Sequence, residues 1–91
     1  MSTKPGRMKI GSIGDGLEGI IMVKALAGAG HTAEAIHVES DQAIERADSL
    51  LPSVEIVSMQ EVAERCDLVI MAMDVQAVEE AVTGLSQLGY F

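Results

Sequence analysis

Aromatic residues and cysteine are scarce in this sequence of 91 residues. It contains no Trp, one Tyr, one Phe and one Cys. A single cysteine cannot form an internal disulfide, so stability has to come from an apolar core, and a reducing cytoplasm is the simplest location. Hydrophobic residues make up 48% of the chain, which excludes a disordered protein. The core must therefore be built from Val, Ile, Leu, Met and Ala, as in a thin buried sheet covered by helices.

Basic residues are also few, with 6 Lys and Arg against 14 Asp and Glu, for a formal net charge of −8. Such a surface repels phosphate backbones and anionic lipids, so nucleic acids and membranes are not expected partners. No apolar run approaches the roughly 20 residues that a membrane span requires. Residues 1–7 are polar, contain Pro5 and Gly6, and lack the apolar stretch of a signal peptide. We expect them to form a flexible tail before a single domain at residues 8–91.

Recognisable catalytic and metal-binding patterns are absent too. His31, His37 and Cys66 are too widely separated to form a metal-ligand motif. No Ser/His/Asp set and no pair of carboxylates at a plausible site can be identified, and no histidine lies near Cys66 in the sequence to activate it. We therefore expect neither a catalytic residue nor a metal site in this chain.

What the chain does contain is a regular alternation of strand-like and helix-like segments. The expected strands are residues 8–13, 33–38, 54–57 and 67–73, and the expected helices are residues 20–29, 41–51, 58–66 and 75–88. The last strand is apolar almost throughout, which is typical of a strand covered on both faces. Helices of about 10 residues between strands imply parallel pairing through right-handed crossovers. The sequence thus predicts an α/β fold of the Rossmann-like type, βαβαβαβα, with a parallel four-stranded sheet in the order 3-2-1-4 and helices on both faces.

Local signals support these helix ends. Gly30 can adopt the positive φ that often follows a helix, and Pro52 disfavours helix at the residue before it. Ser58 and Glu61 match a capping box, and Asp74 is expected to cap the last helix.

A GxGxxG motif joins the first strand to the first helix. Its residues are Gly14, Asp15, Gly16, Leu17, Glu18 and Gly19. In a dinucleotide-binding unit, the first glycine permits the tight turn, the second allows a pyrophosphate to approach the backbone, and the third lets the helix pack against the strand. The free amides and dipole at the helix start would then bind the phosphates. The alternative is that the glycines only form a tight turn.

Three acidic residues bear on the ligand. Glu39 lies about 20 residues after Gly19, where a carboxylate commonly binds the adenosine ribose hydroxyls and disfavours the 2′-phosphate of NADP. Glu39 therefore favours NAD, unless it is simply a solvated residue before a helix. Asp15 and Glu18 lie inside the glycine turn, where they would repel phosphates unless they point away, and where they can stabilise the empty helix.

The runs MKIGSIGDGLEG, KALAGAGH and ERCDLVIMAM are similar to the amino-terminal domains of NAD(P)-dependent oxidoreductases. The sequence resembles most the pyrroline-carboxylate reductase and deazaflavin-dependent NADP oxidoreductase type, over residues 8 to about 88. The resemblance implies that the motif glycines bind pyrophosphate and that Ala72 and Met73 lie near the adenosine or nicotinamide side. The chain departs from that type at Glu39, where many NADP-using relatives have Arg, and at Asp74, where a proline is usual.

Two functions are consistent with this resemblance and with the alternation of strands and helices around the glycine motif. The first is an NAD(P)-binding domain of an oxidoreductase whose catalytic domain is absent from these residues, so that the domain is incomplete and not catalytic alone. The second is a stand-alone nucleotide-binding or regulatory module that works by assembly. An unpaired sheet edge at the first or fourth strand region would suit a homodimer.

Overall fold

The computed structural model describes residues 6–90, so residues 1–5 of the expected tail and Phe91 lie outside the described residues. Gly6 and Arg7 are exposed and form no regular secondary structure. The elements are β1 (Lys9–Ile13), α1 (Leu17–Gly28), β2 (Thr32–His37), α2 (Asp41–Leu50), β3 (Glu55–Ile56), α3 (Met59–Arg65), β4 (Leu68–Met71) and α4 (Val75–Gln87). The predicted order βαβαβαβα is therefore confirmed.

The four strands form one parallel sheet in the order β3-β2-β1-β4, as the helix-length connections predict. β1 lies inside the sheet, between β2 and β4. The register of β1 against β2 shifts between Ile10 and Gly11. A Cβ on Gly11 would lie only 2.3 Å from the carbonyl oxygen of Ala35, so the two backbones approach closely at this irregularity.

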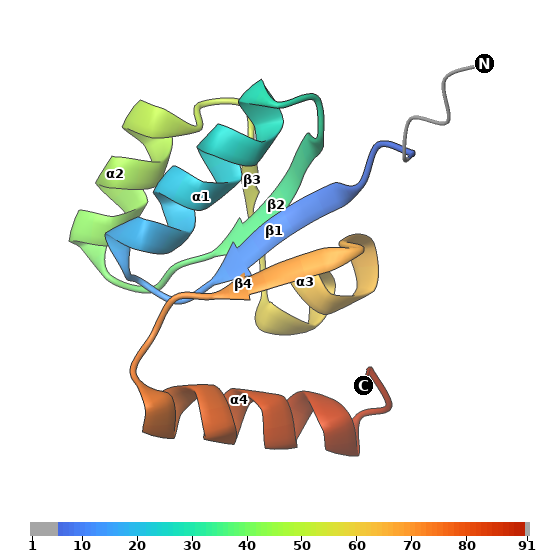
Figure 1. Cartoon of the computed structure of the whole chain (residues 1–91). Coiled ribbons are helices and arrows are strands. Elements are labelled where there is room, and N and C mark those ends of the chain that lie inside the picture. Colours follow the sequence, from blue (N-terminus) through green and yellow to red (C-terminus); the bar gives the residue numbers. More distant parts are fainter. Residues whose placement is uncertain (1–5, 91) are drawn as a thin grey trace.

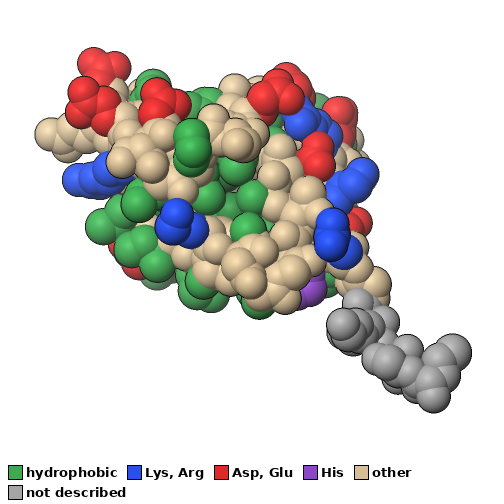
Figure 2. Space-filling view, turned by 90° about the horizontal axis from the view of Figure 1, so that it is seen from above, with side chains coloured by type: hydrophobic (Ala, Val, Ile, Leu, Met, Phe, Trp, Pro, Cys, Tyr) green, Lys and Arg blue, Asp and Glu red, His purple; other side chains and the backbone are tan. Residues whose placement is uncertain are grey.

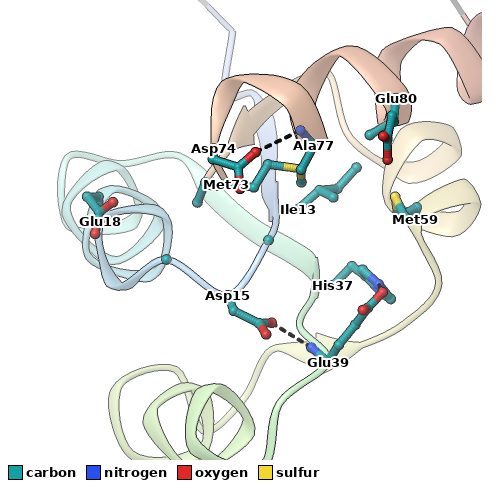
Figure 3. Close-up of a pocket in the computed structure, with 14 residues that line it drawn as sticks. Ile13, Asp15, Glu18, His37, Glu39, Met59, Met73, Asp74, Ala77 and Glu80 are labelled. Atoms are coloured by element: carbon teal, nitrogen blue, oxygen red, sulfur yellow. Dashed lines mark hydrogen bonds and ion pairs between the residues drawn. The ribbon is translucent and has the colours of Figure 1, made fainter.

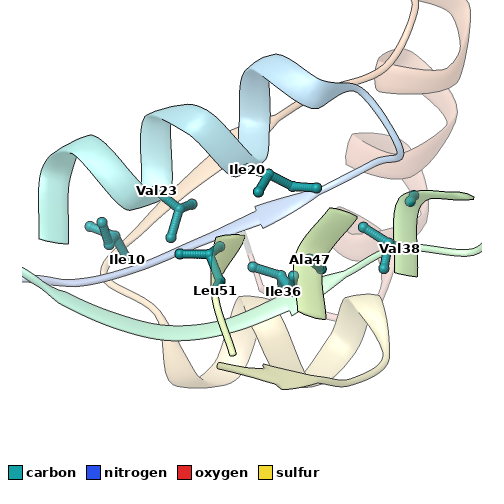
Figure 4. Close-up of a cluster of buried hydrophobic side chains, with 8 residues drawn as sticks. Ile10, Ile20, Val23, Ile36, Val38, Ala47 and Leu51 are labelled. Carbon is teal, nitrogen blue, oxygen red and sulfur yellow. The ribbon is translucent and has the colours of Figure 1, made fainter. Parts of the chain in front are cut away.

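Helices cover both faces of the sheet (Figure 1). α1 and α2 pack together over one face, where the core consists of Ile10, Ile20, Val23, Ile36, Val38, Ala43, Ala47 and Leu51 (Figure 4). α3 lies on the other face, where the buried residues are Ile13, Ala35, Val62 and Leu85. Neighbouring strand residues such as Ala35 and Ile36 belong to different clusters because side chains alternate between the faces of a strand.

The helix ends agree with the local signals, except that only half of the expected capping box forms: among the described residues no hydrogen bond joins the Ser58 N–H to the Glu61 carboxylate. Gly30 has a φ of +107° just after α1. The hydroxyl of Ser58 accepts a hydrogen bond from the Glu61 N–H at 3.2 Å, and the Asp74 carboxylate accepts one from the Ala77 N–H at 2.9 Å. Within residues 6–90, no helix has the length and apolar character needed to cross a bilayer.

Three elements differ from the expectation. α1 begins at Leu17, so Gly19 lies in the first turn of the helix and not in the loop. β3 has two residues, both exposed. β4 is also shorter than expected and is not covered on both faces, since Leu68 is 40% exposed and the rest of the strand is half-buried. β4 is the edge strand, and α4 buries only Ala81 and Leu85, so apolar composition alone overstated its coverage.

Candidate functional site: a cavity at the carboxyl ends of the strands

A cavity of about 800 Å³ opens where β1, β2 and β4 end (Figure 3). It is bounded by the loop after β1, the segment after β2, the start of α3 and the first turns of α4. Seven of the nine predicted site residues line it: Gly14, Asp15, Gly16, Glu18, Glu39, Ala72 and Met73. Leu17 and Gly19 do not. In doubly wound sheets, ligands bind at this end, beside the point where the strand order reverses.

The glycine loop is held between the ends of β2 and β4. The Gly14 N–H donates to the carbonyl of His37 at 3.0 Å, and the Gly16 N–H donates to the carbonyl of Ala72 at 3.0 Å. Gly14 has a φ of +119°, and a Cβ there would lie 2.3 Å from the Ala72 carbonyl oxygen. Only glycine can occupy this turn without strain.

The other two motif glycines also contact the end of β4. A Cβ on Gly16 would lie 2.8 Å from the Ala72 carbonyl oxygen, and a Cβ on Gly19 would lie 2.5 Å from the Ala72 Cβ. Gly19 therefore brings α1 close to the sheet, as expected. The sequence assigned Gly16 to the approach of a pyrophosphate, but its missing side chain faces Ala72. Packing of the empty protein already accounts for all three glycines, so evidence for a ligand has to come from other features.

The amino terminus of α1 provides such a feature. α2, α3 and α4 each have a capping side chain, from Ser40, Ser58 and Asp74 respectively. α1 begins after Gly16 with no side-chain cap, and its Gly19 N–H donates to the Gly16 carbonyl at 3.2 Å instead. As in the other helices, the first two N–H groups, here those of Leu17 and Glu18, have no acceptor within residues 6–90, but in α1 no capping side chain lies over them. Unpaired N–H groups at a helix start, together with the helix dipole, favour an anion.

Asp15 points toward the segment that follows β2 (Figure 3). Its carboxylate accepts hydrogen bonds from the Glu39 N–H at 2.7 Å and the Ser40 N–H at 3.1 Å. These bonds, chiefly the one from Glu39, hold the pKa of Asp15 below its ordinary value. Sequence reasoning placed this charge near the phosphates. It had no signal for the actual partners, which lie 24 and 25 positions further along the chain.

Glu39 and His37 form a pair beside this contact. The Glu39 carboxylate is 2.9 Å from His37 Nε2, and its side chain is 70% exposed. His37 Nδ1 lies 2.7 Å from the carbonyl oxygen of Val57. Glu39 thus stands at the end of β2 and lines the cavity, where the sequence predicts a ribose contact. Sequence reasoning did not assign Met59 and Glu80 to this cavity, since they reach it from α3 and α4.

The cavity is strongly acidic. Its described lining includes no Lys or Arg and has five carboxylates, from Asp15, Glu18, Glu39, Asp74 and Glu80. An anionic ligand would therefore depend on backbone N–H groups and not on cationic side chains, which limits its affinity.

The described residues offer neither a metal-binding cluster nor an activated thiol. The described residues contain no cluster of three or more His, Cys, Asp or Glu side chains that could hold a metal. Cys66 lies at a separate, smaller cavity with Tyr90, and burial raises the pKa of its thiol. A raised pKa favours the protonated thiol, which is a poor nucleophile.

Comparison with known proteins gives a family but no individual relative. No curated protein and no solved structure matches the chain significantly. The family model described as a Rossmann-like domain matches residues 1–90. With its parallel 3-2-1-4 sheet, glycine loop and cavity at the strand ends, the chain belongs to the Rossmann-like domain family.

Proposed function

We propose that this chain binds a dinucleotide in the cavity and serves as the cofactor-binding domain of an NAD(P)-dependent oxidoreductase. The observation that carries the proposal is the uncapped amino terminus of α1, which opens beside the cavity at the carboxyl ends of the sheet. Backbone N–H groups at this point of a doubly wound fold bind pyrophosphate in dinucleotide-binding domains.

Each part of the cofactor has a place among the residues present. The N–H group of Glu18, which lines the cavity, and that of Leu17 next to it would hold the pyrophosphate, and Glu39 would accept hydrogen bonds from the adenosine ribose. Ala72 and Met73 would line the cofactor on the β4 side of the cavity. When bound, the cofactor supplies hydride transfer. The residues of this chain bind and orient it, while acid-base groups would come from another domain.

NAD is the preferred cofactor in this proposal. The Glu39 carboxylate stands where a 2′-phosphate would add a further negative charge to an already acidic cavity. Repulsion between these negative charges at short range disfavours the complex with NADP.

Glu18 offers a sharp test of the pyrophosphate position. Its carboxylate lies over Gly16, since Oε1 is 3.2 Å from where a Cβ of Gly16 would be. In the empty protein this charge stabilises the start of α1. A bound pyrophosphate would be repelled by it, so Glu18→Gln should tighten NADH binding by about threefold at low salt.

The experiment is a titration with NADH, followed by fluorescence or calorimetry, of the wild type, Glu18→Gln and Glu45→Gln. Glu45 is exposed on α2 outside the cavity, so its variant has the same net charge and should bind like the wild type. Amide NMR shifts should be largest at Leu17 and Glu18. Absence of saturable binding at millimolar NADH, or shifts confined to other regions, would refute the proposal. Substitution of Gly16 is a poorer test, because a side chain there meets the Ala72 carbonyl.

A second function, assembly without a cofactor, is favoured by exposed apolar surface. β4 ends the sheet and pairs only with β1 among the described residues, and its Leu68 is 40% exposed. On α1, Ile21 and Met22 are about half exposed, and Figure 2 shows apolar surface among the charged side chains. Light scattering distinguishes the two functions. A concentration-dependent dimer together with no NADH binding would favour assembly.

A further inference from the structure

We propose that Asp15 is a specificity residue that disfavours the 2′-phosphate of NADP by occupying, with its own carboxylate, the two backbone donors nearest the end of β2. This inference rests on the proposed dinucleotide function. It assigns the cofactor preference mainly to a residue of the glycine loop, rather than to Glu39 at the end of β2.

The contact is a built anion site already occupied from within the chain. Asp15 bridges the loop after β1 and the segment between β2 and α2, where its two oxygens accept from Glu39 N–H at 2.7 Å and Ser40 N–H at 3.1 Å. In the first turn of α2, the Ala43 N–H donates to the Ser40 hydroxyl at 3.1 Å, whereas the Asp41 and Gln42 N–H groups have no acceptor among the described residues. The two donors nearest the end of β2, the Glu39 and Ser40 N–H groups, are therefore already bonded to the Asp15 carboxylate.

The position of this contact matters because the adenosine ribose of a dinucleotide lies between the glycine loop and the end of the second strand. A 2′-phosphate on that ribose points toward the segment after the strand. Here it would meet the Asp15 carboxylate, and it would gain neither the Glu39 N–H nor the Ser40 N–H unless it displaced that carboxylate. A ribose 2′-hydroxyl is neutral and can donate a hydrogen bond to a carboxylate, so NAD meets no such conflict.

Asp15 differs from Glu39 in how firmly it is held. The Glu39 side chain is 70% exposed, and its partner within hydrogen-bond distance is His37, so it can rotate aside. Asp15 is fixed by two backbone donors, which bind its ionised form and hold the pKa of the carboxyl below its ordinary value. A fixed charge discriminates more strongly than a mobile one, because moving it would break both hydrogen bonds.

The test compares NADH and NADPH affinities of the wild type, Asp15→Ser and Asp15→Asn. The wild type should prefer NADH, and Asp15→Ser should reduce that preference by about tenfold, chiefly by tightening NADPH binding. Asp15→Asn should reduce the preference for NADH by a smaller factor, because its amide oxygen can still accept a hydrogen bond from one of the two N–H groups. Asp48→Asn is the matched control, because Asp48 is exposed on α2, lies outside the cavity, and carries the same charge. An unchanged ratio of affinities in Asp15→Ser would overturn the inference while leaving the proposed function intact.

A titration with fragments of the cofactor distinguishes failure of the proposed dinucleotide function from failure of the inference about Asp15. Adenosine 2′,5′-bisphosphate should shift the amide resonances of Glu39 and Ser40 in Asp15→Ser, and not in the wild type. 5′-AMP, which lacks the 2′-phosphate, should cause similar shifts in both proteins. Spectra of the free variants also report whether they fold. If no variant binds either dinucleotide but the bisphosphate still shifts these amides in Asp15→Ser alone, the proposed function fails and the cofactor specificity fails with it, although Asp15 still competes with a phosphate for these donors. If the bisphosphate causes no such shift, the inference fails.

Discussion

At the scale of single residues, the carboxylate of Asp15 does more than add charge to a turn. It ties the glycine loop to the start of α2 through the backbone N–H groups of Glu39 and Ser40. A carboxylate held this way is bound more tightly in its ionised form, so the native state lowers its pKa from an ordinary value of 3.8. The contact consequently makes folding stability depend on pH.

The sign of that dependence follows from proton binding. Because the folded pKa lies below the unfolded one, the stabilisation from Asp15 is fully present above the unfolded value of 3.8 and is lost as pH falls through the lower folded value. Urea unfolding of the wild type and Asp15→Asn should show a stability difference at neutral pH that shrinks only below pH about 4. A difference that stays constant into the acid range would show that the charge of Asp15 contributes nothing.

At the scale of elements, the closeness of α1 to β4 is set by Gly19. A Cβ at this position would lie 2.5 Å from the Ala72 Cβ and 3.3 Å from the Ser12 Cβ. Both neighbours are buried, and Ser12 is fully so. The helix cannot carry a larger residue here without moving away from the sheet, and that movement would also displace the glycine loop at the cavity.

Gly19→Ala should therefore lower the free energy of unfolding by about 1–3 kcal/mol through overpacking. Gly28→Ala is the matched variant in the same helix, where nothing lies within 4 Å of the added Cβ. It should raise stability by up to about 1 kcal/mol, since alanine favours helix over glycine. Denaturant unfolding measures both effects.

Ala72→Gly tests whether contact with the Ala72 methyl group causes the loss of stability in Gly19→Ala. Added to Gly19→Ala, it should recover part of the lost stability, because it removes the methyl group that the new side chain meets. Equal effects of alanine at positions 19 and 28 would contradict the close contact between α1 and β4.

At the scale of the whole molecule, the sheet with α1, α2 and α3 is more tightly packed than α4. α1 and α3 pack closely against the sheet and α1 against α2, whereas no element in the described part of the chain packs as closely against α4, which buries only Ala81 and Leu85 among its 13 residues. Regions with few buried apolar contacts open locally at a smaller free-energy cost than the core does. α4 is also one wall of the cavity, through residues such as Ala77 and Glu80.

Hydrogen exchange followed by mass spectrometry should show this hierarchy. Amide hydrogens of α4 are expected to exchange before those of β1 and β2, and NADH should slow exchange at the start of α1 if it binds as proposed. Leu85→Ala, which removes a side chain only 3% exposed, should speed exchange in α4 more than in β2. Exchange of all elements at one common rate would instead indicate that α4 and the sheet open as a single unit.

Much of the fold follows from the sequence by itself. Helix-length segments between strands permit the crossovers that parallel pairing requires, and the observed strand order is the one with which a doubly wound sheet commonly begins. The caps at Ser58 and Asp74 and the positive φ of Gly30 were also predictable. These features depend on residues close together in the chain, or on a chirality common to all such folds.

The tertiary structure decided how the candidate site is built. It brought Ala72 against the three motif glycines, turned Asp15 onto the donors after β2, and added Met59 and Glu80 to the cavity wall. It also left β4 half exposed despite its apolar composition. The physical reason is that these contacts join residues far apart in sequence, so they depend on strand register and helix placement, which no local pattern of residues specifies.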